Sequence, residues 1–219
     1  MGLNRRSFLQ ALGIATGASA SRKMSQLVGG NSLYRSKELG VQFRAPRSWY
    51  WLTKSQIGNV IDDLRYKPVD DLPERALKEV VGRPVVVVTR HAEPFEGVNP
   101  NFQITPGPPL PEFDLVTGHE FGLESFKEIF HNFKVVDPPD LDTLGGVEAS
   151  RAMVTYTYRS RSEPSVSCRV ETWHLDLGHL SLGVSMGDRT HGGWSASVVS
   201  GFEYCKRHFR VLDSGSGAA

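Results

Sequence analysis

The stretch GVEASRAMVTYTYRSRSEPSVSCRVETWHLDLGHLSLGVSM, residues Gly146–Met186, decides the fold of this chain. Apolar or aromatic residues alternate with polar ones along it, and polar, turn-forming segments interrupt the alternation. Because successive side chains of a β-strand point to opposite sides, this period of two predicts strands with one apolar side. The predicted strands are Val147–Arg159, Val166–His174 and His179–Met186, joined as an antiparallel meander.

The apolar side of this meander is expected to be covered, while its polar side is expected to meet water. The residues expected to be covered are Ala152, Val154, Tyr156 and Tyr158 on the first strand, Val166, Cys168 and Val170 on the second, and Leu180, Leu182, Val184 and Met186 on the third. Those expected in water include Arg151, Arg159, Ser167, Arg169, Glu171, His179, Ser181 and Ser185.

Outside the meander, the periodicity of apolar residues predicts helices that can cover it. Apolar residues at helical spacing predict helices at Ser55–Tyr66, Leu72–Val81 and Gly118–Phe133, the last with Phe126, Ile129, Phe130 and Phe133 on one side. A final helix, capped by Thr190 or Asp188, would bury Trp194, Val198, Phe202, Cys205 and Phe209.

Shorter strands complete the expected pattern. They are a hairpin at Tyr34–Lys37 and Val41–Ala45, and strands at Val85–Thr89, Asn101–Thr105 and Val135–Val136. Pro106–Pro111 is expected to be a stiff loop, and Asp137–Asp140, which contains two prolines, a turn. Because strands and helices do not alternate regularly, we expect an α+β domain with a central antiparallel sheet.

Composition indicates one globular domain. The chain has 219 residues, of which 39% are hydrophobic and 22% charged, and its formal net charge is +1. A charge this close to zero argues against a nucleic-acid partner. No apolar run approaches the roughly 20 residues that a membrane-spanning helix needs.

The N-terminal residues resemble a twin-arginine export signal. Arg5 and Arg6 are followed by Phe8 and Leu9, then by a weakly apolar run that ends at Ala18-Ser19-Ala20, a small-x-small sequence typical of signal peptidase sites. The resemblance implies export of an already folded protein to the periplasm, or to the thylakoid lumen of a photosynthetic host. We therefore expect a signal at 1–20, a linker at 21–32, a domain at 33–213 and a polar tail at 214–219.

The two cysteines, Cys168 and Cys205, are compatible with an exported protein. Both lie at positions predicted to face the core. Their spacing leaves open either a disulfide between them or two buried thiols.

A hairpin motif near the start of the predicted domain resembles that of PsbP-like proteins. Gly40, Phe43, Pro46 and Trp49 form a Gly-x-x-Phe-x-x-Pro-x-x-Trp pattern, and the meander with its final helix resembles the C-terminal half of that family. The resemblance covers about Ser32–Asp213 and implies an antiparallel sheet between helices, a fold shared with a Ran-binding import factor. It further implies a non-catalytic accessory or assembly factor on a photosynthetic membrane. No ligand set of the family can be placed on residues of this chain.

One sequence motif matches a pattern known from catalytic sites. Gly183–Gly187 has the form G-x-S-x-G and contains Ser185, with Asp188 and His191 close behind. In hydrolases such a serine sits on a turn between a strand and a helix, with its acid and histidine on later strands. Too little chain follows Ser185 for that assembly, so an exported serine hydrolase is the alternative hypothesis and a turn the simpler interpretation.

Histidines near a predicted turn raise the question of a metal. His174, Asp176 and His179 could together bind a divalent cation such as calcium, although no H-x₃-H or C-x₂-C pair is present. A metal- or small-ligand-binding protein is therefore a further alternative hypothesis. We otherwise expect no cofactor. The sequence thus favours an exported accessory or binding protein, associated with photosystem II if the host is photosynthetic. Its partner would be a protein of the envelope or of a photosynthetic membrane. Peripheral membrane association and the oligomeric state stay open.

Overall fold

Two antiparallel sheets organise the chain in this computed structural model, which describes residues 33–63, 84–93, 95, 98–110, 113–159, 164–190 and 194–212. The larger sheet has seven strands in the order β3-β4-β5-β9-β8-β7-β6, and the smaller has the order β1-β2-β10. The α+β class predicted from the sequence is therefore confirmed. The predicted signal 1–20, the linker 21–32, the helix Leu72–Val81 and the tail 214–219 lie outside the described residues.

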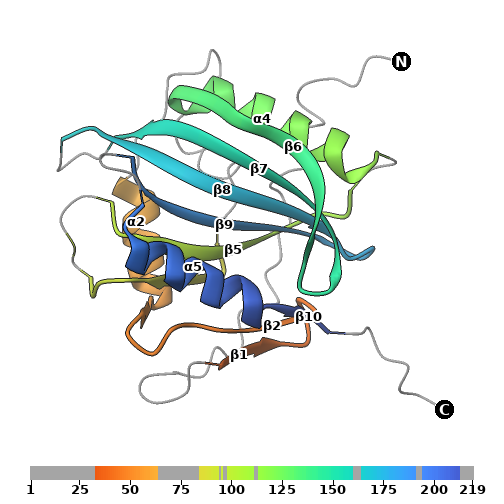
Figure 1. Ribbon diagram of the computed structural model, residues 1–219, viewed down its shortest axis with the longest axis horizontal. Helices are drawn as coiled ribbons and strands as arrows, with labels where there is room; N and C mark the ends of the chain where they lie inside the picture. Colours follow the sequence, from red (N-terminus) through yellow and green to blue (C-terminus); the bar gives the residue numbers. More distant parts are fainter. Residues whose placement is uncertain are drawn as a thin grey trace.

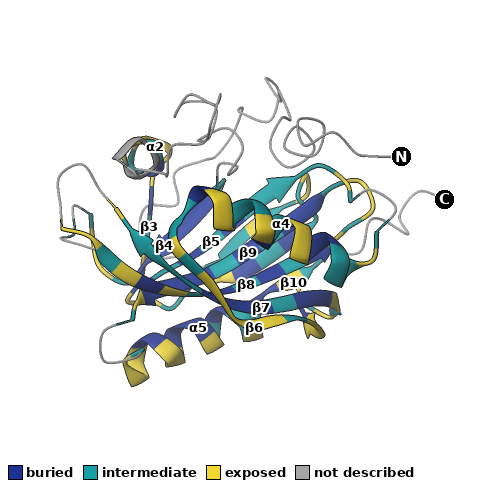
Figure 2. Cartoon of the chain, turned by 90° about the horizontal axis from the view of Figure 1, so that it is seen from above, coloured by how far each residue is buried: buried dark blue, intermediate teal, exposed yellow. Residues whose placement is uncertain are grey.

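The strands of the larger sheet are β3 (Tyr50–Trp51), β4 (Val86–Thr89), β5 (Asn101–Gly107), β6 (His131–Leu144), β7 (Val147–Tyr158), β8 (Val166–Asp176) and β9 (Ser181–Arg189). The smaller sheet consists of β1 (Leu33–Ser36), β2 (Val41–Arg44) and β10 (Arg210–Val211). The helices are α2 (Lys54–Asp63), α4 (Leu115–Ile129) and α5 (Ala196–His208). Helices α2 and α4 lie on one face of the larger sheet and α5 on the other (Figures 1 and 2).

The predicted meander is present, but its apolar residues do not share one face. Met186 pairs with Glu171 and Val184 with Trp173, whereas Val170 pairs with Val154. The apolar residues of β9 therefore lie on the α5 face, opposite to those of β7 and the first half of β8. Both faces of the meander are packed, and Glu171, which we expected in water, is only 3% exposed.

The main core lies between the α5 face of the larger sheet, α5 itself and β2. Phe43 of β2 packs on Phe102 of β5 with ring centroids 4.8 Å apart, and Phe202 of α5 meets Trp49 edge-on at 5.6 Å. The helical stripe predicted from Val198, Phe202 and Cys205 is buried as expected. The remaining core side chains include Val41, Ile104, Trp173, Leu175, Leu182, Val184, Met186 and Phe209.

The longest strand replaces a predicted turn. Asp137–Asp140 lies inside β6, which we expected to end at Val136. The pairing of β6 with β7 shifts register between Val135 and Asp137 and again between Asp137 and Asp140. Because β6 is an edge strand, prolines can occupy positions whose missing N–H would have faced solvent, and bulges absorb the irregularity.

Helix boundaries also differ from the prediction. Helix α4 begins after Asp114, whose carboxylate accepts a hydrogen bond from the Thr117 amide at 2.9 Å, and ends at Ile129, so Phe133 belongs to β6 instead. Helix α5 is capped by Ser195 and not by Thr190 or Asp188. Strand β5 continues to Gly107, into the segment that we expected to be a loop.

The turn between β6 and β7 joins the two sheets. Gly145 has a φ of +70°, and its carbonyl oxygen accepts a hydrogen bond from the Val211 amide of β10 at 3.2 Å. A Cβ atom at Gly145 would stand 2.7 Å from Cδ1 of Phe209. This position therefore requires glycine both for its backbone conformation and for the close approach of Phe209.

Gly145→Ala is expected to lower the free energy of unfolding by about 3 kcal/mol, since it adds overpacking to positive-φ strain. Urea denaturation measures the loss. Gly178→Ala is the matched control, because Gly178 has a φ of +78° and a Cβ there would meet nothing within 4 Å. The control should lose only about 1 kcal/mol, the backbone part. Equal losses in the two variants would contradict the contact with Phe209.

Candidate functional site

The serine of the G-x-S-x-G string lies in the middle of a strand. Ser185 belongs to β9, which pairs with β5 on one side and β8 on the other, so β9 is an interior strand. The side chain of Gln103 donates a hydrogen bond to Ser185 Oγ at 2.7 Å. Ser185 thus has extended backbone in the interior of a sheet. The nucleophile of a hydrolase lies instead on a sharp turn between a strand and a helix.

The proposed acid of that string lies on the other face. Asp188 is three residues from Ser185 on one strand, and positions an odd number apart point to opposite sides. Asp188 is 7% exposed, accepts a hydrogen bond from the Arg189 amide at 2.7 Å and has a pKa raised by burial. Its pairing partner on β8 is Arg169. Ser185 and Asp188 are therefore not brought together, and His191 lies outside the described residues.

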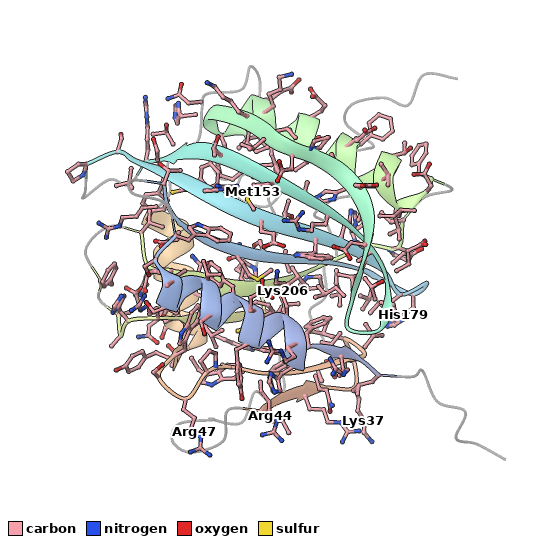
Figure 3. All side chains as sticks on the ribbon, in the orientation of Figure 1. Lys37, Arg44, Arg47, Met153, His179 and Lys206 are labelled. Atoms are coloured by element: carbon pink, nitrogen blue, oxygen red, sulfur yellow. The ribbon has the colours of Figure 1, made fainter. Side chains whose placement is uncertain are left out.

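Of the residues proposed for a metal, His174 and Asp176 lie two residues apart on one side of β8, whereas His179 lies beyond the end of that strand. His179 is exposed at the end of the β8–β9 hairpin (Figure 3), where its Nδ1 lies 3.1 Å from the Leu177 carbonyl oxygen. The Asp176 carboxylate accepts a hydrogen bond from the Gly178 amide at 2.9 Å and so shapes the turn. Within the described ranges, no group of three or more His, Cys, Asp or Glu residues is placed to hold a metal ion.

The two cysteines are free thiols on opposite faces of the larger sheet. Cys168 is two residues from Val170, which packs under α4, whereas Cys205 belongs to the core beneath α5. Burial raises the pKa of each thiol to about 12, so neither is a nucleophile at neutral pH.

The residues of the Gly-x-x-Phe-x-x-Pro-x-x-Trp motif have structural roles. Gly40 has a φ of +63° in the turn between β1 and β2, and Phe43 is fully buried. The Trp49 amide donates a hydrogen bond to the Pro46 carbonyl at 2.9 Å, which fixes the turn after β2. A Cβ atom on Gly201 of α5 would collide with the Trp49 ring, so the motif also positions α5.

A pair of histidines that was not predicted from the sequence lies between α4 and the sheet. His119 of α4 is 4% exposed, and its Nδ1 lies 3.0 Å from Oγ of the buried Ser150 on β7. The ring of His174 meets that of His119 edge-on at 5.7 Å. Burial lowers the pKa of His119 to about 3 and that of His174 to about 4. A signal was available, because His119 precedes the buried Leu123 by four residues, one helical turn.

A charged cluster covers the α5 face beside the core. The carboxylate of Glu171 on β8 accepts hydrogen bonds from Arg151 Nε at 2.7 Å and Lys206 Nζ at 3.4 Å. Both cations also stand 5.9 Å from the ring of Trp173. Figure 3 shows that Lys206 comes from α5, so this cluster ties the helix to β7 and β8. Its contacts are internal, which makes it a structural cluster and not a binding site.

The edge strand β6 is the most accessible apolar surface of the described residues. It pairs with β7 on one side only, and it forms the upper border of the larger sheet in Figure 1. Val135, Val136 and Leu141 are 40%, 48% and 52% exposed. The other exposed large hydrophobic residues lie on separate elements: Tyr50 on β3, Phe121 on α4 and Val199 on α5. Three exposed apolar side chains on a strand that pairs on one side only mark a surface suited to contact with another protein.

No helix among the described residues is long and apolar enough to cross a membrane.

Comparison with known proteins finds similarity only at the level of the fold. No family model matches the chain, and no curated protein matches it. Solved structures with a similar fold share little sequence with it. The Ran-binding protein Mog1p of Saccharomyces cerevisiae is 10% identical, with 84% of this chain and 97% of that chain covered and a TM-score of 0.48.

Two further structures are similar to the same degree. The cyanobacterial PsbP protein CyanoP of Synechocystis is 13% identical, with 87% of this chain and 99% of that chain covered and a TM-score of 0.45. LpqN of Mycobacterium tuberculosis, which is involved in cell envelope biogenesis, is 11% identical, with 84% of this chain and 86% of that chain covered and a TM-score of 0.46. No functional residue can be transferred from proteins this distant.

Proposed function

We propose that this chain is an exported, non-catalytic accessory or binding protein that acts by contact with another protein. The observation that carries the proposal is the edge strand β6, with its unpaired outer side and the exposed side chains of Val135, Val136 and Leu141. Backbone N–H and C=O groups of a free edge can bind a partner, and neighbouring apolar side chains add specificity. The export part of the proposal rests on Arg5 and Arg6 and the residues after them.

The arrangement around Ser185 supports the non-catalytic part of the proposal. Its hydroxyl is engaged by Gln103, and Asp188 lies on the other face of the sheet. The imidazole of His119 is buried beneath α4 with Ser150 as its polar neighbour, and the half-buried ring of His174 meets it edge-on. In a photosynthetic host, the partner we propose is a component of photosystem II, because the hairpin motif resembles that of PsbP-like proteins.

The role of β6 can be tested by replacing its exposed apolar residues with threonine, which keeps the strand propensity. Val135→Thr, Val136→Thr and Leu141→Thr together should leave the fold intact and reduce recovery of the partner at least about tenfold, since apolar contacts at the centre of an interface dominate affinity. A photo-crosslinking residue at position 136 of the otherwise unchanged chain identifies the partner in envelope extracts by mass spectrometry.

The matched control carries Tyr50→Thr and Val199→Thr, two exposed apolar residues on other elements. It should recover the crosslinked partner as the unchanged chain does, with circular dichroism showing that both variants are folded. Recovery of the same partner at full yield by the β6 variant would refute a contact through β6.

A further inference from the structure

The outer face of the small sheet is strongly basic. Its six exposed cationic side chains come from β1, β2, β10, the turns beside them and the end of α5: Arg35, Lys37, Arg44, Arg47, Arg207 and Arg210. The register places Arg35 and Arg210 on either side of Gln42, so the three form one row across the sheet. Figure 3 shows Lys37, Arg44 and Arg47 along the lower border of the domain, pointing away from it.

These cations are not neutralised by neighbouring carboxylates. Among the described residues of this face the only acidic one is Glu38, in the turn between β1 and β2. No described carboxylate lies within ion-pair distance of the six basic groups, whereas Lys206 on the inner side of α5 is paired with Glu171 and Glu203. The chain as a whole is almost neutral at +1, so the basic face reflects an uneven distribution of charge and not a basic composition.

The chemistry of the face favours an anionic membrane surface over an acidic protein. Protein interfaces depend on apolar and aromatic side chains at their centre, and the exposed large hydrophobic residues of the described chain all lie elsewhere. Binding to anionic headgroups needs only several cations on a surface that can lie flat on the bilayer. The small sheet is also the part of the domain that follows most closely on the predicted export signal, with residues 21–32 between them.

We infer that the outer face of the small sheet, with the side chains of Arg35, Lys37, Arg44 and Arg47, binds the anionic headgroups of a phospholipid bilayer. The contact is peripheral and electrostatic. It does not depend on the protein contact proposed for β6, because the two surfaces lie on opposite borders of the domain (Figure 1). A chain held in this way would direct β6 away from the bilayer.

Sedimentation of the full chain with vesicles tests the inference. The chain should bind vesicles of phosphatidylglycerol and phosphatidylcholine at about 50 mM salt and be released at about 500 mM, because screening weakens charge contacts at a surface. Arg35→Gln, Arg44→Gln and Arg47→Gln together should lower the partition coefficient about a hundredfold, at about fivefold for each cation. Arg210 is left unchanged because its guanidinium donates to the carbonyl oxygens of Arg207 and Phe209.

The matched control carries Lys127→Gln, Lys134→Gln and Arg159→Gln, which change the net charge equally but lie on α4, β6 and the end of β7. It should bind as the unchanged chain does, and both variants retain the same N-terminal residues. Equal binding of the unchanged chain to neutral phosphatidylcholine vesicles would overturn the inference. So would an equal loss in the two triple variants, or salt-sensitive binding to polyglutamate without binding to the vesicles.

Discussion

Lowering the pH from 7 to 5 is expected to remove about 3 kcal/mol from the free energy of unfolding, because His119 and His174 are kept neutral in the folded state. Burial lowers the pKa of His119 to about 3 and that of His174 to about 4, against an ordinary value of 6.5. Between pH 6.5 and about 4 the unfolded chain binds protons at both residues and the folded chain does not. Stability is therefore full above pH 6.5 and is lost as the pH falls through that window.

The packing around the two rings explains why protonation is costly. His119 has Ser150 as its polar neighbour on β7, and His174 faces Gly183 on β9 and the exposed Asp176 along its own strand. Two imidazolium ions with ring centroids 5.7 Å apart would repel one another beneath α4. Asp188 acts in the opposite direction, since burial raises its pKa and so favours the folded state on acidification. The Arg189 amide and guanidinium limit that rise, so Asp188 offsets only a fraction of the loss.

Urea denaturation at pH 7 and pH 5 measures the effect. The double variant His119→Gln, His174→Gln should have a nearly pH-independent midpoint over this range, because glutamine does not titrate. His179→Gln is the control, since His179 is exposed at the end of a hairpin, and it should keep the acid sensitivity of the unchanged chain. Acid sensitivity that survives in the double variant would show that other groups cause it.

Removing the carboxylate of Glu171 is expected to cost about 3 kcal/mol, the lower end of the range for breaking a buried ion pair. The Glu171 side chain is 4% exposed and accepts hydrogen bonds from both Arg151 and Lys206. Glu171→Gln leaves Arg151 beside the ring of Trp173 without its carboxylate partner and leaves Lys206 with only Glu203. The side chains of Arg151 and Lys206 are 35% and 20% exposed, so water compensates part of the loss and places the cost at this lower end.

The second ion pair of Lys206 provides the control. Lys206 is also 2.6 Å from the carboxylate of Glu203, which is 53% exposed, so Glu203→Gln should cost at most about 1 kcal/mol. Replacing Glu171 and Arg151 together by Leu and Met should recover stability relative to Glu171→Gln, because no unpaired cation remains on β7. If the two glutamine variants lose the same stability in urea denaturation, the buried carboxylate has no special role.

The sequence predicted those elements whose packing depends on a local repeat. The stripe of Val198, Phe202 and Cys205 and the alternation in β7 follow from spacing along one element. Spacing along β9 alone does not tell which face of the sheet its apolar residues occupy, because that face depends on the register between β9 and β8. Trp173 and Leu175 in the second half of β8 indicate the correct face. They lie at odd-numbered positions, opposite to Val170, and they pair with Val184 and Leu182 of β9.

The candidate surfaces were harder to predict than the elements. Asp137 and the prolines after it indicate a turn by composition, and only the position of β6 at the edge of the sheet makes them acceptable in a strand. The basic residues of the small sheet are separated in sequence by most of the domain, from Arg35 to Arg210, and come together because β10 pairs with β2. Gly145, by contrast, belongs to a Gly-Gly pair, which indicates a turn from two adjacent residues alone.

That pairing of β10 with β2 also constrains how the protein is made. Val41 of β2 leaves the ribosome long before Val211 of β10, its partner in the small sheet. The nascent chain therefore cannot complete this sheet until residue 211 has been synthesised, and such long-range contacts form late in folding. A chain interrupted before β10 would lack one strand of the small sheet and would leave one side of β2 unpaired.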